Sequence, residues 1–180
     1  MQKRKKSHSK KIEIEIFEIK LRRILLQMDR DKTRSKSLKA LKNMLTMAPV
    51  EMMPLVWTSL SFVYFYEKQY QYSIYYCKKT VDEYSLTPEA IFCATMLVHL
   101  YRLLGMKKER YEAEGSRFHL MKKIIMQSEN QEHRLFALKE LRQEFEDRDL
   151  LSHFYTFFDQ TLNHNHGVAL LESAEKSMAD

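Results

Sequence analysis

The chain has 180 residues, enough for one domain with its own hydrophobic core. Its 44% hydrophobic residues exclude a disordered chain, and its three glycines and three prolines exclude a loop-rich β protein. The formal net charge of +6 is unevenly spread: residues 1–48 hold fifteen Lys or Arg against five Asp or Glu, while residues 49–180 hold fifteen against nineteen. We therefore expect a helical protein with a basic N-terminal third.

The N-terminal residues show two different patterns. Residues 1–11, MQKRKKSHSKK, hold six basic and no acidic side chains and are predicted to form a disordered basic arm. Residues 12–19 alternate apolar and acidic side chains, which by itself is typical of a strand. Phe17, Leu21 and Ile24 nevertheless recur at helical spacing, and no other segment offers a convincing partner strand. We therefore predict a helix from residue 12 onward.

Proline and glycine mark the ends of the helices that follow. Pro54 suits a first helical turn, Thr87 and Pro88 suit a cap and first residue, and Gly105 suits a helix end. After a polar break at 128–131, two amphipathic segments precede a short final helix. The predicted helices cover about 34–48, 54–68, 70–84, 88–104, 107–127, 135–145, 150–162 and 168–177.

Large and small residues recur along the chain in a repeated spacing. One predicted hairpin has the pattern W-x-x-L-(small)-x-x-Y on its first helix and small and apolar residues on its second, at Trp57, Leu60, Ser61, Tyr64, Tyr70, Ser73 and Cys77. Similar sets end at Met28, thirty-six residues before Tyr64, and at Tyr101, thirty-seven residues after it. The pattern resembles the tetratricopeptide repeat, although Ser61 takes the place of the usual Gly and Cys77 that of the second-helix aromatic.

This resemblance implies an all-α fold in which antiparallel helical hairpins stack as a short α-solenoid. About three repeats would occupy residues 12–127, and helices in 128–180 would cap the apolar end of the stack. In this family the first helices of successive hairpins line a concave groove that commonly receives an extended peptide or a partner helix. We transfer the groove positions of this family to the present sequence by helical phase. The resemblance then implies the following groove residues: Arg22, Leu26, Arg30, Thr58, Phe62, Phe65, Tyr66, His99 and Arg102.

The sequence shows no motif for catalysis, a cofactor or a metal. None of the seven histidines has a glutamate three residues before it, and three glycines cannot build a phosphate-binding loop. Cys77 and Cys93 lie in apolar helical surroundings, which favours buried thiols in a cytoplasmic-type compartment. The longest uncharged run, residues 52–66, is too short to span a bilayer. We expect a cytoplasmic protein that is not an enzyme and needs no cofactor; residues 3–6 also match a nuclear-import-like run.

Three hypotheses for function remain. The first is a helical-repeat adaptor or chaperone-like protein that binds a peptide or helix of a partner protein in an aromatic and basic groove. The second is RNA binding through the basic residues of 1–42, with Phe62, Phe65 or Tyr66 as stacking groups. The third is a self-associating structural subunit, because the aromatics and eleven methionines suit adaptable apolar surfaces.

Overall fold

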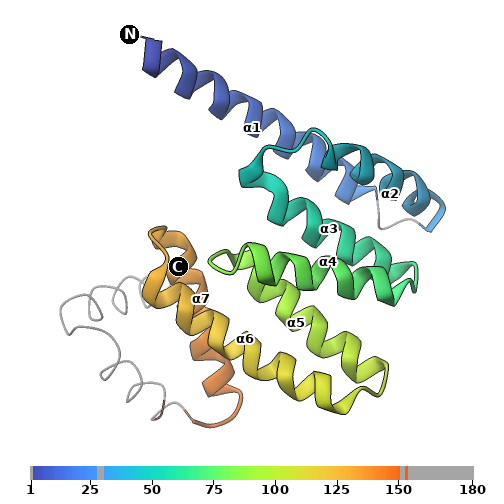
Figure 1. Cartoon of the computed structure of the whole chain (residues 1–180), viewed down its shortest axis with the longest axis vertical. Coiled ribbons are helices and arrows are strands. Elements are labelled where there is room, and N and C mark those ends of the chain that lie inside the picture. The colour runs from blue at the N-terminus through green and yellow to red at the C-terminus, as the bar shows by residue number, and fades with distance from the viewer. Residues whose placement is uncertain (1, 28–30, 151–152, 154–180) are drawn as a thin grey trace. The chain divides into compact units, whose positions relative to one another are not determined.

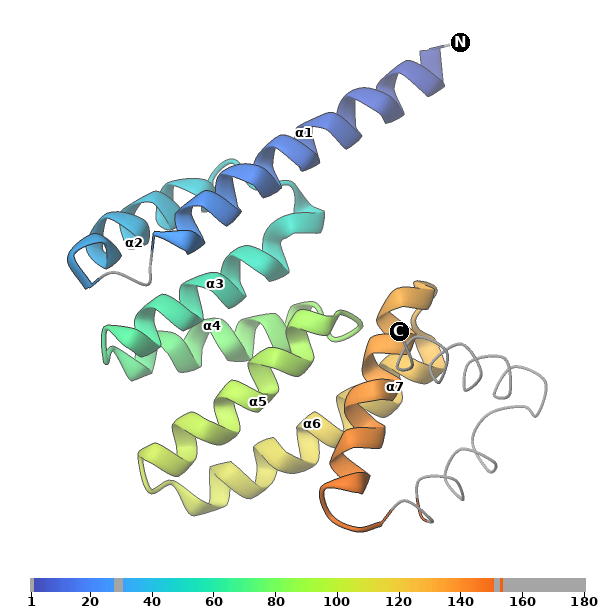
Figure 2. The same cartoon turned by 180° about the vertical axis from the view of Figure 1, so that it is seen from behind.

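The computed structural model describes residues 2–27, 31–150 and 153. Within these residues the chain is all-α, as predicted, with seven α-helices and one short 3-10 helix. Figure 1 labels the seven α-helices. The helices pack mostly against their neighbours in sequence, in antiparallel pairs, and Figure 2 shows these pairs from behind. The chain divides into two compact units, Met1–Glu83 and Tyr84–Asp180, called here the N-terminal and C-terminal units.

The N-terminal unit begins with a long helix, α1 (Gln2–Leu26), so the prediction of a helix rather than a strand at residues 12–19 is confirmed. The structure also continues this helix over residues 2–11, where the sequence predicts a disordered arm. The physical reason is cooperativity: residues 2–26 contain no Pro or Gly, and each residue added to an existing helix gains one hydrogen bond.

The second helix, α2 (Asp31–Leu45), packs on α1. Phe17 and Leu21 of α1 and Leu41 and Met44 of α2 are all less than 9% exposed. These residues recur three or four positions apart on each helix, so each helix presents one apolar stripe to the other. A 3-10 turn, η1 (Val50–Met52), then leads into the next hairpin.

The hairpin of α3 (Met53–Tyr66) and α4 (Tyr70–Glu83) completes the N-terminal unit. Pro54 lies in the first turn of α3, as predicted. The small side chains of Ser61 and Ser73 are fully buried, and the Ser73 hydroxyl donates to the Ser61 carbonyl at 2.8 Å. The two serines therefore bring the helices together at the positions that the repeat pattern assigns to small residues.

The C-terminal unit begins with the hairpin of α5 (Pro88–Leu103) and α6 (Lys107–Gln127). Thr87 is the N-cap residue of α5, but its hydroxyl donates to the Tyr84 carbonyl at 2.9 Å and makes no capping hydrogen bond to α5. Gly105 has a positive φ of 71°, and the following amide, of Met106, donates to Tyr101 O at 2.9 Å. This is the left-handed helix end that favours glycine.

The last described helix, α7 (Gln131–Glu146), packs on α6 and α5. Ile91, Ile124, Leu138 and Leu141 belong to the buried core that these three helices share. The division between the two units falls between α4 and α5, within the range 12–127 that the repeat pattern groups as one array. The amphipathic segment predicted at 150–162 and the final helix predicted at 168–177 lie outside the described residues, apart from Leu150 and His153.

Candidate partner-binding surface

The groove residues predicted from the repeat phase are distributed over both units. Arg22 and Leu26 belong to α1, four residues belong to α3, and His99 and Arg102 are exposed on α5 in the other unit. Arg30 lies outside the described residues. On α1, Leu26 is 77% exposed, and Arg22 pairs with Glu18 of its own helix at 2.6 Å.

The structure brings two of the predicted α3 residues together. The rings of Phe65 and Tyr66 meet edge to face with centroids 5.7 Å apart, and Tyr70 lies 6.0 Å from Phe65. Tyr66 is 54% exposed, and the guanidinium of Arg34 lies 5.4 Å from its ring centroid. An exposed tyrosine beside an arginine has the composition of a protein-binding hot spot.

Thr58 differs from the prediction. Its side chain is only 7% exposed, and its hydroxyl donates to the Pro54 carbonyl one turn earlier at 2.8 Å. Phe62 is half-buried on the same helix. The reason is that α3 packs against both α2 and α4, so few of its faces are left for a partner.

Tyr64 anchors a second aromatic cluster, and it is buried as the repeat phase predicts. Its ring, 3% exposed, stacks on Tyr72 and Tyr76 with centroids 5.1 and 5.7 Å apart. Lys42 Nζ lies 5.5 Å from the Tyr64 centroid, and its hydrogen bond with this tyrosine raises the pKa of the lysine above 10.5. Burial raises the pKa of the Tyr76 hydroxyl. Tyr64 therefore joins α2, α3 and α4 rather than contacting a partner.

A groove of about 580 Å³ runs between α1 and α2 of the N-terminal unit. Phe17 and Met44, which are 8% and 5% exposed, belong to its floor. Ile16 and Met47 also line it and are 48% and 69% exposed. The remaining lining residues are Glu13, Lys20, Arg23, Ile24, Ala40 and Asn43.

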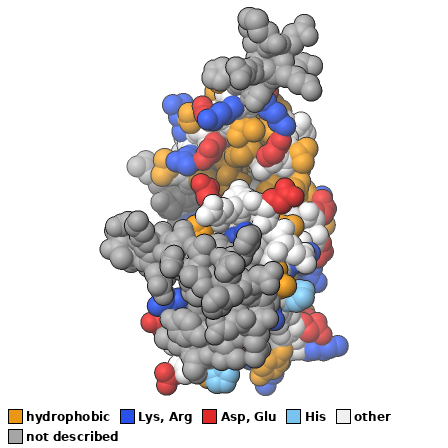
Figure 3. Space-filling view, turned by 90° about the vertical axis from the view of Figure 1, so that its left-hand side faces the viewer, with side chains coloured by type: hydrophobic (Ala, Val, Ile, Leu, Met, Phe, Trp, Pro, Cys, Tyr) orange, Lys and Arg blue, Asp and Glu red, His pale blue; other side chains and the backbone are white. Residues whose placement is uncertain are grey.

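The face of α1 beside this groove has a second apolar stripe. Ile12, Ile16 and Ile19 recur at helical spacing and are 43%, 48% and 52% exposed. In Figure 3, hydrophobic side chains lie among Lys, Arg, Asp and Glu side chains in the upper part of the view. A helix with two apolar stripes has more apolar surface than one partner helix covers, so the sequence signals an uncovered apolar face on α1 without showing which stripe it is.

Basic side chains predominate around the groove. Lys20, Arg23 and Glu13, all of α1, are its charged lining residues, so two basic side chains stand against one carboxylate. Farther along α1, Lys10 pairs with Glu51 of η1, and this hydrogen bond lowers the pKa of the glutamate. The groove therefore combines an apolar floor with a net positive edge.

No protein-family model, curated protein or solved structure matches the chain. Within the described residues, no three His, Cys, Asp or Glu side chains are grouped so that they could hold a metal ion. None of the described helices is both long enough and apolar enough to cross a membrane. Cys77 and Cys93 are fully buried thiols, one in each unit.

Proposed function

We propose that this protein is a non-enzymatic, tetratricopeptide-like adaptor that binds a helix of a partner protein. The observation that supports this most directly is the groove between α1 and α2, which has an apolar floor and exposed Ile16 and Met47 along its edge. Two packed helices present such a groove to a third helix, which fills it with its own apolar stripe. The serine contact between α3 and α4 adds the close hairpin packing on which the repeat resemblance rests.

The occupant that fits this groove is an amphipathic helix with acidic residues on either side of its apolar stripe. Lys20 and Arg23 against Glu13 leave one positive charge in excess along the lining. Residues 1–48 as a whole carry a net charge of +10, so the field around the groove also favours an acidic partner. Apolar contacts would then supply affinity, and the flanking charges would supply the association rate and the orientation.

Designed peptides test this proposal on the full chain. Three fluorescein-labelled peptides share one amphipathic apolar stripe: one has Glu on both flanks, one has Lys, and one has Glu flanks with two central prolines. We expect the helical Glu peptide to bind at least about tenfold more tightly than either of the others, because a tenfold change corresponds to about 1.4 kcal/mol. Fluorescence anisotropy at fixed ionic strength measures the dissociation constants.

A double variant, Ile16→Glu with Met47→Glu, locates the site. Both side chains are exposed, so the variant should fold, while two carboxylates in the groove would repel the acidic peptide. The matched control is Leu103→Glu, an equally exposed leucine in the C-terminal unit, which should leave peptide affinity unchanged. Equal affinity of the double variant and the wild type would contradict the assignment of this groove.

The two other hypotheses from the sequence give different results in parallel measurements. The RNA-binding hypothesis predicts that the chain binds single-stranded RNA and not the peptides. It also predicts that the logarithm of the RNA affinity falls linearly with the logarithm of the salt concentration. If light scattering over a dilution series shows a concentration-dependent mass, the chain self-associates. Either result, without discrimination among the peptides, would replace the adaptor proposal.

A further inference from the structure

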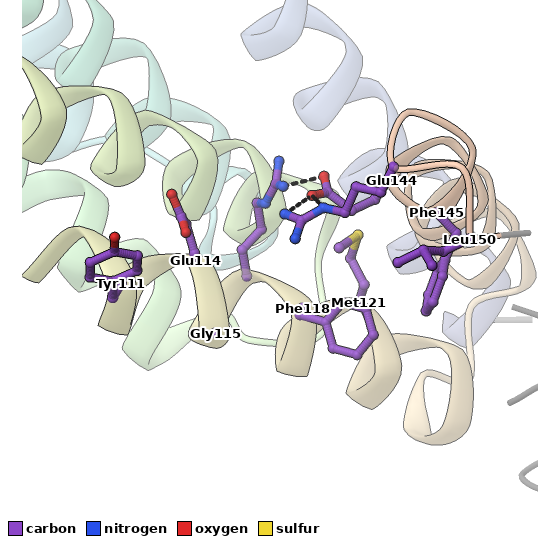
Figure 4. Close-up of a pocket in the computed structure, with 10 residues that line it drawn as sticks. Tyr111, Glu114, Gly115, Phe118, Met121, Glu144, Phe145 and Leu150 are labelled. Atoms are coloured by element: carbon purple, nitrogen blue, oxygen red, sulfur yellow. Dashed lines mark hydrogen bonds and ion pairs between the residues drawn. The ribbon is translucent and has the colours of Figure 1, made fainter. Parts of the chain in front are cut away.

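The C-terminal unit holds a pocket of about 400 Å³ between α6 and the end of α7, which lies within the size range of small-molecule sites. Figure 4 shows Tyr111, Gly115 and Phe118 along α6, facing Phe145 and Leu150 across the pocket. The rings of Phe118 and Phe145 meet with centroids 5.6 Å apart and pack on the buried core of this unit. The pocket therefore has an apolar floor that is continuous with the core.

Gly115 has no side chain and therefore leaves free space beside the middle of α6 at this pocket. Glycine is a poor helix former, and an interior glycine normally has a packing reason. Here a Cβ atom added to Gly115 would have no heavy atom within 4 Å, and the residue is exposed. Ala113, by contrast, is buried, so it supplies the small side chain on the face of α6 that packs inside the unit. No neighbour among the described residues needs the missing side chain, so the free space at Gly115 belongs to the pocket.

Two arginines share one carboxylate at the wall of this pocket. Arg117 of α6 and Arg148, just after α7, both bind Glu144, and Arg148 Nε donates to Glu144 Oε1 at 2.9 Å (Figure 4). The Nε of Arg117 is buried and has no hydrogen-bond partner among the described residues. A guanidinium has five N–H donors, so this pair retains donors beyond those that Glu144 accepts.

The charges at the pocket leave one positive charge in excess. Glu114, which also lines it, is paired with Arg110 at 3.5 Å on the same helix. Arg110 does not itself line the pocket, but with Glu114 paired to it, Glu144 is the one carboxylate left for Arg117 and Arg148, so three guanidiniums stand against two carboxylates. Glu144 also holds both guanidinium groups in position. Arginines that are already held in position can bind an anion without first becoming ordered.

We propose that this pocket binds a small amphiphilic anion: its apolar body lies along Phe118 and Phe145 over the Gly115 backbone, and its anionic group is bound by Arg117 and Arg148. The apolar walls supply the affinity for the body of the ligand, and the arginines select a carboxylate or sulfonate over a neutral head group. This site lies within the C-terminal unit and does not depend on the adaptor proposal.

Fluorescence of 8-anilinonaphthalene-1-sulfonate, an aromatic sulfonate, tests the pocket on the full chain. We expect one probe per chain, displaced by decanoate at about tenfold lower concentration than by decanol, because hydrogen bonds to a charged group contribute more than those to a neutral one. Arg148→Gln, at a side chain that is 58% exposed, should reduce this preference severalfold. Lys108→Gln, an 85% exposed lysine of the same unit, should leave it unchanged.

Two leucine variants show whether the probe occupies this pocket or another surface. Gly115→Leu should abolish probe binding because its side chain fills the space, yet it should raise the melting temperature because leucine is a far better helix former. Ser116→Leu, at the next position, which is also exposed but lies outside the pocket lining, should leave probe binding intact. The proposal is overturned if the wild type binds no probe, if decanol competes as well as decanoate, or if the two leucine variants bind alike.

Discussion

Replacing Ser73 tests how closely α3 and α4 must approach. This side chain is 0% exposed, and its hydroxyl donates to the Ser61 carbonyl across the hairpin at 2.8 Å. In Ser73→Ala the hydrogen bond is lost without a steric change, which should lower the free energy of unfolding by about 0.5–1.5 kcal/mol. In Ser73→Leu the hydrogen bond is lost and a larger side chain is forced between the helices, which adds about 1–3 kcal/mol. The expected total for Ser73→Leu is therefore about 1.5–4.5 kcal/mol.

The single tryptophan makes this measurement specific to the N-terminal unit. Trp57 is 3% exposed on α3, so its fluorescence reports the unfolding of the hairpin in which Ser73 lies. Urea titration of each variant gives the free energy of unfolding by linear extrapolation. The control is Gln71→Leu, an exposed position on the same helix, which should change stability by less than about 0.5 kcal/mol. If Ser73→Leu proves as stable as Gln71→Leu, the close serine contact is not what holds α3 and α4 together.

Three further substitutions test the C-terminal unit, each followed by circular dichroism during urea unfolding. Ile124→Ala removes a fully buried side chain from the shared core of α5, α6 and α7 and should cost about 2–5 kcal/mol; a smaller loss would mean that this core can collapse around the cavity. Asn130 accepts from the amides of Glu132 and His133 at 2.9 and 3.3 Å, so Asn130→Ala should cost about 0.5–2 kcal/mol, whereas Asn130→Asp should retain the cap. Gly105→Ala places a Cβ on a residue with φ of 71° and should cost about 1–2 kcal/mol, so a neutral result would refute the left-handed turn between α5 and α6.

The sequence predicts the helix boundaries well where backbone chemistry sets them. Pro88 begins α5, Gly105 follows its end, and α6 covers the predicted range from Lys107 to Gln127. These signals act locally, because proline lacks an amide hydrogen and glycine tolerates a positive φ whatever the rest of the fold does. The burial of Tyr64 was also predictable, since a repeated helical spacing identifies the face that packs inside a hairpin.

The candidate sites were less predictable because they depend on which helices meet. The helical phase of the repeat pattern predicted that Thr58 faces a groove. Thr58 is buried instead, because α2 and α4 both pack on α3, whereas the repeat pattern assumed that one face of α3 is open. The groove beside Ile16 requires α2 to cover only one of the two apolar stripes of α1, which the stripes alone do not reveal.

The sequence by itself thus determines that this protein is helical, where helices marked by proline or glycine begin and end, and which small residues lie inside the hairpin of α3 and α4. The tertiary structure decides which apolar faces remain uncovered and which charges meet, such as Arg117 with Glu144, twenty-seven residues away along the chain. The physical reason is the distance along the chain over which each effect acts. Helix formation depends on hydrogen bonds between residues four apart, whereas the exposure and pairing of a side chain depend on segments brought together only by packing of the whole unit.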